Sequence, residues 1–96
     1  MTTARVVVRN PSGLHARPAA LFVRTCGQFG SRITVSNPGA DKGPVDAKSI
    51  LSVLTLGVSS GTEIEVSAEG EDANAALAAI RAVVEAGLGE DVEAAT

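Results

Sequence analysis

The sequence predicts an α+β fold, an open-faced two-layer sandwich in the order β-α-β-β-α-β-α, whose four-stranded antiparallel sheet is covered on one face by three helices. Three observations predict it. The chain has 96 residues, enough for a single domain with one modest core. Its strand-like segments alternate polar and apolar residues, as half-covered sheets do. Between them lie segments with apolar residues at helical spacing.

The first half of the chain predicts two strands and a helix. A β-branched run at residues 5–9 predicts the first strand, and loop-forming residues follow at 10–13. A helix with Pro18 in its first turn then carries apolar side chains at helical spacing and ends near Gly27. Alternation at residues 32–36 predicts the second strand.

The second half predicts two strands and two helices. Residues 37–44 are typical of an extended turn, and we expect a short strand at 45–47 that pairs with the strand at 32–36 as a hairpin. Ser49 is a good N-cap for a short helix that stops near Gly57. Residues 63–67 alternate and form the fourth strand. Asp72 is the expected N-cap of the last helix, and Gly87 is its C′ residue.

The ends and the composition set further expectations. We expect one domain over residues 1–96, with an acidic, frayed tail at residues 90–96. A net charge of −3 and only two aromatic residues exclude the basic, ring-bearing face of a nucleic-acid binder. The single cysteine, Cys26, excludes an internal disulfide and falls on the apolar stripe of the first helix, so we expect it in the core.

The chain lacks a signal-like apolar N-terminus and has no apolar run near the ~20 residues that span a bilayer. We therefore expect a cytoplasmic protein without direct membrane insertion.

The only histidine, His15, carries the clearest chemical signal. It precedes the first helix, where the N–H groups of Ala16 and Arg17 lack intrahelical acceptors and the helix dipole is positive. Arg17 adds a guanidinium whose fork geometry suits phosphate oxygens. A neutral imidazole nitrogen is a nucleophile, so the combination suits a phosphohistidine. A surface histidine beside a solvated arginine is the alternative.

Three motifs in order resemble one protein family. The sequence GLHARPAA at residues 13–20 resembles the active-site signature of the HPr family, the histidine-containing phosphocarriers of the bacterial phosphoenolpyruvate:sugar phosphotransferase system. AKSIL at residues 47–51 resembles that family's regulatory serine motif, and a third match runs from TLGV at residues 55–58 to residue 70. The resemblance covers roughly residues 4–88, and the family's fold agrees with the order predicted above.

The resemblance implies a relay rather than an enzyme. His15 would accept a phosphoryl group on Nδ1 from phospho-enzyme I and donate it to enzyme IIA proteins, for coupled sugar uptake and phosphorylation. Arg17 would support the phosphate, together with Ser12 and Ala16. Ser49 would be a regulatory site for the HPr kinase/phosphorylase, and a transcriptional regulator would be a further partner. We expect no cofactor and no metal.

We expect partner proteins to dock on an apolar surface with a basic rim, formed by two helices near His15. Its candidate residues are Ala20, Leu21, Arg24, Ile50, Leu51 and Leu54. A short helix cannot bury all its apolar side chains on one face, so one or two of them should be exposed. We expect a monomer that presents this one surface to several partners.

Two features depart from the family pattern, and other functions stay open. The turn at residues 37–44 is longer than usual, and we place it away from His15. Gly27 stands where many relatives carry a lysine on the docking face. The main alternative is an HPr-like paralogue of the nitrogen-related or glycerone-kinase-linked branch. A ligand- or metal-binding module and an enzyme with His15 as general base are the others, and no second catalytic group is evident for the last.

Overall fold

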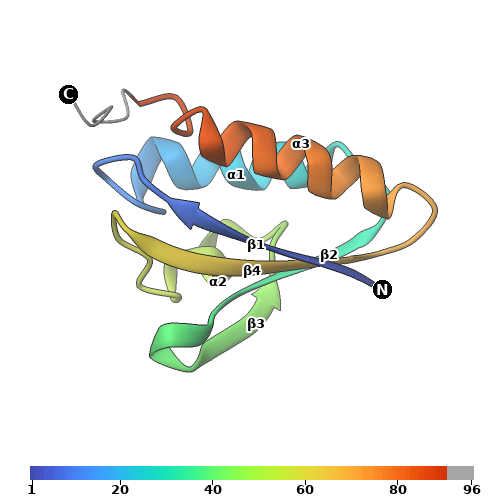
Figure 1. The fold of residues 1–96 in the computed structure, drawn as a ribbon, viewed down its shortest axis with the longest axis horizontal. Coiled ribbons are helices and arrows are strands. Elements are labelled where there is room, and N and C mark those ends of the chain that lie inside the picture. Colours follow the sequence, from blue (N-terminus) through green and yellow to red (C-terminus); the bar gives the residue numbers. More distant parts are fainter. Residues whose placement is uncertain (91–96) are drawn as a thin grey trace.

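The computed structural model describes residues 1–90, and within them it contains the predicted elements in the predicted order (Figure 1). The strands are β1 (Thr2–Val8), β2 (Arg32–Asn37), β3 (Lys42–Asp46) and β4 (Thr62–Glu69). The helices are α1 (Ala16–Gly27), α2 (Ile50–Leu54) and α3 (Ala73–Glu85), and a short 3-10 turn, η1 (Pro38–Ala40), precedes β3. The predicted α+β fold class is confirmed.

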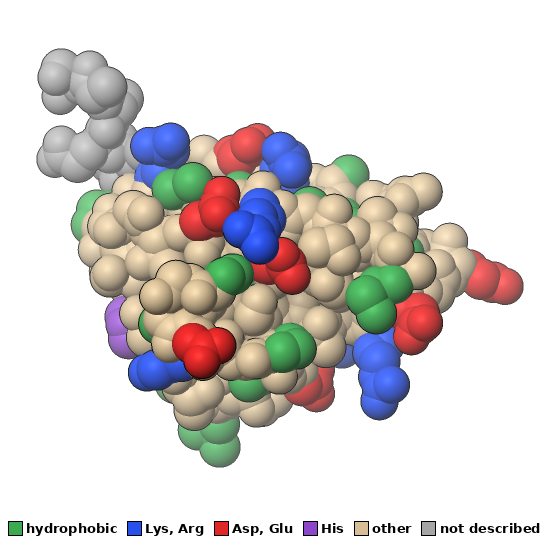
Figure 2. Space-filling model, turned by 60° about the horizontal axis from the view of Figure 1, so that its bottom comes forward, with side chains coloured by type: hydrophobic (Ala, Val, Ile, Leu, Met, Phe, Trp, Pro, Cys, Tyr) green, Lys and Arg blue, Asp and Glu red, His purple; other side chains and the backbone are tan. Residues whose placement is uncertain are grey.

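The sheet is antiparallel throughout, in the strand order β1-β4-β2-β3. In its register Val6 stands opposite Ile64, and both side chains are buried beneath the helices. On the other face Arg5 donates to Glu65 at 3.0 Å and to Glu63 at 3.4 Å. These exposed ion pairs add little stability. The alternation of the strands thus separates an apolar, covered face from a polar, open one, where Figure 2 shows acidic and basic side chains side by side.

Helices α1 and α3 lie next to each other across one face of the sheet, and α2 packs against α1 and β3 (Figure 1). Their apolar stripes meet the strands in one core. Its largest fully buried side chains include Leu14, Phe22, Leu56, Ile80 and Leu88. Cys26 is also fully buried, as predicted, and this burial raises the pKa of its thiol to about 12.

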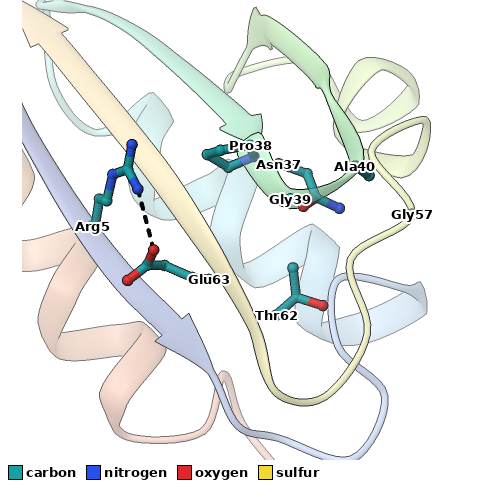
Figure 3. A pocket seen from close by; sticks show the side chains of 8 residues that line it. All are labelled: Arg5, Asn37, Pro38, Gly39, Ala40, Gly57, Thr62 and Glu63. Carbon is teal, nitrogen blue, oxygen red and sulfur yellow. Dashed lines mark hydrogen bonds and ion pairs between the residues drawn. The ribbon is translucent and has the colours of Figure 1, made fainter.

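The turn at residues 37–44 is more structured than predicted, because it contains η1 and the first half of β3. Asn37 is buried and donates through Nδ2 to the carbonyl of Leu56 at 2.9 Å. Together with η1, Asn37, Gly57 and Thr62 line part of a shallow hollow of about 660 Å³ on the open side of the sheet (Figure 3).

The turn at residues 37–44 was expected to lie away from His15, and its position in the structure differs. The loop that carries His15 packs on Val58, because Leu14 donates to the Val58 carbonyl. Val58 in turn lies in the segment from Gly57 to Thr62, and both of these residues line the same hollow as the turn. Figure 1 shows both loops at the same end of the sheet. The turn therefore lies nearer to the His15 end than the sequence analysis placed it.

Asp72 stands at the N-cap position of α3, as predicted, but its side chain does not cap that helix. Its carboxylate instead accepts hydrogen bonds from the backbone of Gly30 at 2.9 Å and of Ser31 at 3.0 Å, and from the Ser31 hydroxyl. The bond from the Ser31 hydroxyl, followed by the Gly30 backbone, lowers the pKa of Asp72 below its ordinary value of 3.8. Asp72 thus ties the start of α3 to the connection between α1 and β2.

This tie predicts an acid-sensitive contribution to stability. Because the pKa of Asp72 is lower in the folded chain, its carboxylate stabilises the fold at neutral pH, and the effect is lost as the pH falls through that lowered value. We expect Asp72→Asn to lower the free energy of unfolding at neutral pH and to match wild type in strong acid. Urea unfolding across this range measures the difference. Glu71→Gln, at the exposed neighbouring carboxylate, is the control, and a pH-independent loss in Asp72→Asn would contradict the account.

Candidate functional site

His15 occupies the N-cap position of α1 with an extended backbone, at φ −132° and ψ 156°, and its side chain is exposed. An N-cap side chain normally accepts a bond from the first helical turn. The His15 side chain makes no such bond, so its ring nitrogens are free of the helix it precedes. Figure 2 shows the histidine at one edge of the molecular surface, open to solvent.

The backbone around His15 is fixed although its side chain is not. Leu14 is buried and donates its N–H to the carbonyl of Val58 at 3.1 Å. Gly13, at φ +61°, leaves no room for a side chain, because an added Cβ would overlap the Val58 carbonyl oxygen and come within 2.7 Å of the Ser59 Cα. The loop is therefore held against the Val58–Ser59 backbone, and His15 is the first exposed residue after the buried Gly13 and Leu14.

Ala16 turns the chain from this loop into the helix through a left-handed conformation at φ +50°. Such a conformation costs an L-residue about 1–2 kcal/mol. The N–H groups of Ala16 and Arg17 begin the first turn and have no intrahelical acceptor there, and Pro18 has no N–H at all. A helix start of this kind attracts anions. The structure thus places His15 directly before the helix start, as the sequence predicted.

The structure adds one residue that the sequence analysis missed. Glu90 was expected in a frayed tail, but its Oε1 accepts from Asn10 Nδ2 and from the Ser12 backbone N–H, both at 3.0 Å. Its Oε2 accepts from the Ser12 hydroxyl at 2.8 Å. The side-chain bond from Asn10, the two bonds from Ser12 and the charge of Arg17 together lower the pKa of Glu90. The remaining tail, residues 91–96, lies outside the described residues.

Glu90 is related to two predicted site residues, to Ser12 by hydrogen bonds and to Arg17 by charge. Ser12, a weak candidate in the sequence, is the main contact of Glu90 within the His15 loop. Arg17 is exposed on the first turn of α1, close enough for its charge to act on Glu90. No local pattern marks Glu90, because 78 residues separate it from Ser12.

The predicted docking residues lie on two helices that contact each other, α1 and α2. On α1, Ala20 and Arg24 are exposed and Leu21 is partly buried. On α2, three apolar side chains are exposed, Ile50 (38%), Leu51 (75%) and Leu54 (37%). From the sequence we expected one or two. Only Val53 of this helix is fully buried, since a five-residue helix turns a single side toward the core.

Ser49 caps α2, as predicted. Its hydroxyl oxygen accepts from the Ser52 N–H at 3.3 Å. The preceding Lys48 donates through Nζ to the carbonyl of Phe29 at 2.7 Å, which links this motif to the end of α1. Ser49 therefore sits at the start of the helix that exposes Ile50, Leu51 and Leu54.

Two further findings concern the described residues alone. Within residues 1–90, no three His, Cys, Asp or Glu side chains gather as a metal ion would require. In the same residues, no helix combines the length and the apolar character needed to cross a membrane.

Known proteins match this chain over most of its length. The family model described as PTS HPr component phosphorylation site matches residues 2–86. A multiphosphoryl transfer protein of Salmonella typhimurium is 47% identical over 88 residues, which are 92% of this chain and 23% of that protein. The chain thus spans about a quarter of the length of that relative. The phosphocarrier protein HPr of Streptomyces coelicolor is 43% identical over 94% of this chain and 95% of its own length.

Solved structures match over nearly the whole chain. HPr-C-His from Thermoanaerobacter tengcongensis superposes with a TM-score of 0.89 at 42% identity, covering 96% of this chain and 100% of that one. An HPr dimer from the same organism superposes with a TM-score of 0.72 at 43% identity, covering 94% and 100%. The chain therefore belongs to the PTS HPr family of phosphocarriers.

Proposed function

We propose that this chain is a cytoplasmic phosphocarrier that accepts a phosphoryl group on His15 from phospho-enzyme I and donates it to enzyme IIA proteins, for coupled sugar uptake and phosphorylation. One observation carries the proposal: His15 stands at the start of α1 with an exposed imidazole that makes no capping bond, beside Arg17 and the free N–H groups of the first turn.

The chemistry needs little more than these groups. A neutral Nδ1 attacks the phosphorus of the donor phosphohistidine, and the new N–P bond forms as the donor's N–P bond breaks. The donor imidazole leaves with the electron pair of that bond. The N–H groups of Ala16 and Arg17 and the Arg17 guanidinium then face the dianion. Helix-end stabilisation at exposed sites is about 0.3–1 kcal/mol, which holds the group without trapping it.

The exposed side chains of α1 and α2 suit the docking step. Leu51, which is 75% exposed, with Ile50 and Leu54 beside it, offers partners an apolar centre, and Arg24 adds a positive charge at its rim. Apolar anchors supply most of the energy of such interfaces, whereas rim charges mainly speed association. A monomer would present this surface to each partner in turn.

The sugar branch and a paralogous branch share this chemistry and differ in partners. An HPr-like paralogue would take its phosphoryl group from a different enzyme I. Comparing phosphorylation rates with enzyme I proteins of the sugar and nitrogen-related branches would assign the chain to one of them. Ser49 is the proposed regulatory site, open to an HPr kinase/phosphorylase and, once modified, to a transcriptional regulator.

We expect His15→Ala to abolish phosphorylation by enzyme I and phosphoenolpyruvate, because the only histidine is lost. Wild type should gain a single phosphate that is labile in acid and stable in base.

Arg17→Ala keeps the acceptor and should slow the transfer about 100-fold, the effect of removing one preorganised charge-stabilising group. Radiolabelled phosphate in the intact protein measures both. Phosphorylation of His15→Ala at the wild-type rate would contradict the proposal.

We expect Ser49→Asp to weaken docking to enzyme I, because it places a negative charge at the edge of the exposed apolar side chains of α2. The KM for the carrier should rise roughly five-fold with little change in kcat. Asn74→Asp is the matched control, since it adds the same charge near the start of α3. Equal KM values for Ser49→Asp and wild type would contradict the expectation that a negative charge at this position weakens docking.

A further inference from the structure

The carboxylate of Glu90 accepts from three donors in the loop that precedes His15. Asn10 Nδ2 and the Ser12 N–H both donate to Oε1 at 3.0 Å, and the Ser12 hydroxyl donates to Oε2 at 2.8 Å. The segment after α3 thus contacts the loop between β1 and α1. Figure 1 shows the end of α3 at the same side of the molecule as that loop.

These donors are built into the fold. Asn10 is fully buried, and its amide also donates to the carbonyl of Gly13 at 3.0 Å. Gly13 in turn lies against the backbone of Val58. Asn10 is therefore held by contacts other than the carboxylate, and Ser12 lies between Asn10 and the fixed Gly13. A carboxylate and a phosphoryl group use the same kind of donor.

The same donors belong to the loop that leads into the reacting residue. Ser12 is three positions before His15, and Arg17 is two positions after it. Arg17 also acts on Glu90, because its positive charge helps to lower the pKa of that carboxylate. A phosphoryl group on His15 and the Glu90 carboxylate would thus draw on the same positive groups while repelling each other.

We propose, on the basis of the phosphocarrier function above, that Glu90 is a positioning residue that competes with the phosphoryl group of His15 for Ser12 and Arg17. In the resting protein Glu90 occupies both Ser12 donors. After phosphorylation the Glu90 carboxylate and the phosphoryl group compete for Ser12 and Arg17. The phosphoryl group is therefore held less tightly than it would be in the absence of Glu90. This keeps the group ready for transfer.

The test uses the full chain and a small donor, phosphoramidate, so that no partner protein is needed. Phosphorus NMR follows the loss of the phosphoryl group from His15 to water in wild type, Glu90→Gln and Glu85→Gln. We expect Glu90→Gln to lose it about two- to five-fold more slowly, the range given by a single exposed charge interaction. Glu85→Gln, an exposed carboxylate at the end of α3, should match wild type.

A second variant separates competition from a merely structural contact. Glu90→Asp keeps the charge, so its rate of loss should stay closer to wild type than that of Glu90→Gln. If Glu90 served only to anchor the segment after α3, both variants would lower the thermal midpoint and leave the rate of loss unchanged. That result, or a faster loss in Glu90→Gln, would overturn the inference.

The outcomes also separate the inference from the function on which it rests. If wild type takes no phosphoryl group on His15, the phosphocarrier function fails and the inference fails with it. If wild type and Glu90→Gln are both phosphorylated on His15 and lose the group at the same rate, the inference alone fails.

Discussion

The contact of Gly13 with the backbone at Val58 is the constraint on which the site depends. The glycine has φ +61°, and the Val58 carbonyl leaves no room for a Cβ. Leu14 can then bury its side chain and donate to the same carbonyl. Because the chain is fixed up to Leu14 and enters α1 at Ala16, His15 is held by its backbone on both sides while its side chain remains in solvent.

This arrangement suits a carrier better than an enzyme with a cleft. An exposed imidazole on a fixed backbone can meet several partners in one geometry, and preorganisation of this kind reduces the cost of each encounter. In the free carrier these groups hold the phosphoryl group only weakly, since exposed helix ends and charges contribute about 0.3–1 kcal/mol, whereas Arg17 acts more strongly on the charge that develops during transfer. A relay needs such moderate interactions, because a group that is bound too firmly is not passed on.

The sequence predicted what depends on local pattern. Alternation and helical spacing gave the element order, and the N-cap propensity of Ser49 and the apolar stripe around Cys26 were confirmed. Prediction from the sequence failed where a side chain bonds to a residue that is distant in the sequence. Asp72 bonds to Gly30 and Ser31 rather than to its own helix, and Glu90 reaches Ser12 across 78 residues. Periodicity shows which face of an element is buried, but not which loop lies beside its end.

The central claim is that a phosphoryl group on His15 rests on the start of α1. Nitrogen–proton correlation spectra of the chain before and after phosphorylation by phosphoramidate test it most directly. The account predicts one phosphohistidine at Nδ1, with the largest amide shifts at Ala16 and Arg17. Phosphorylation of His15 that leaves these two amides unmoved, or a phosphoryl group on another residue, would contradict it.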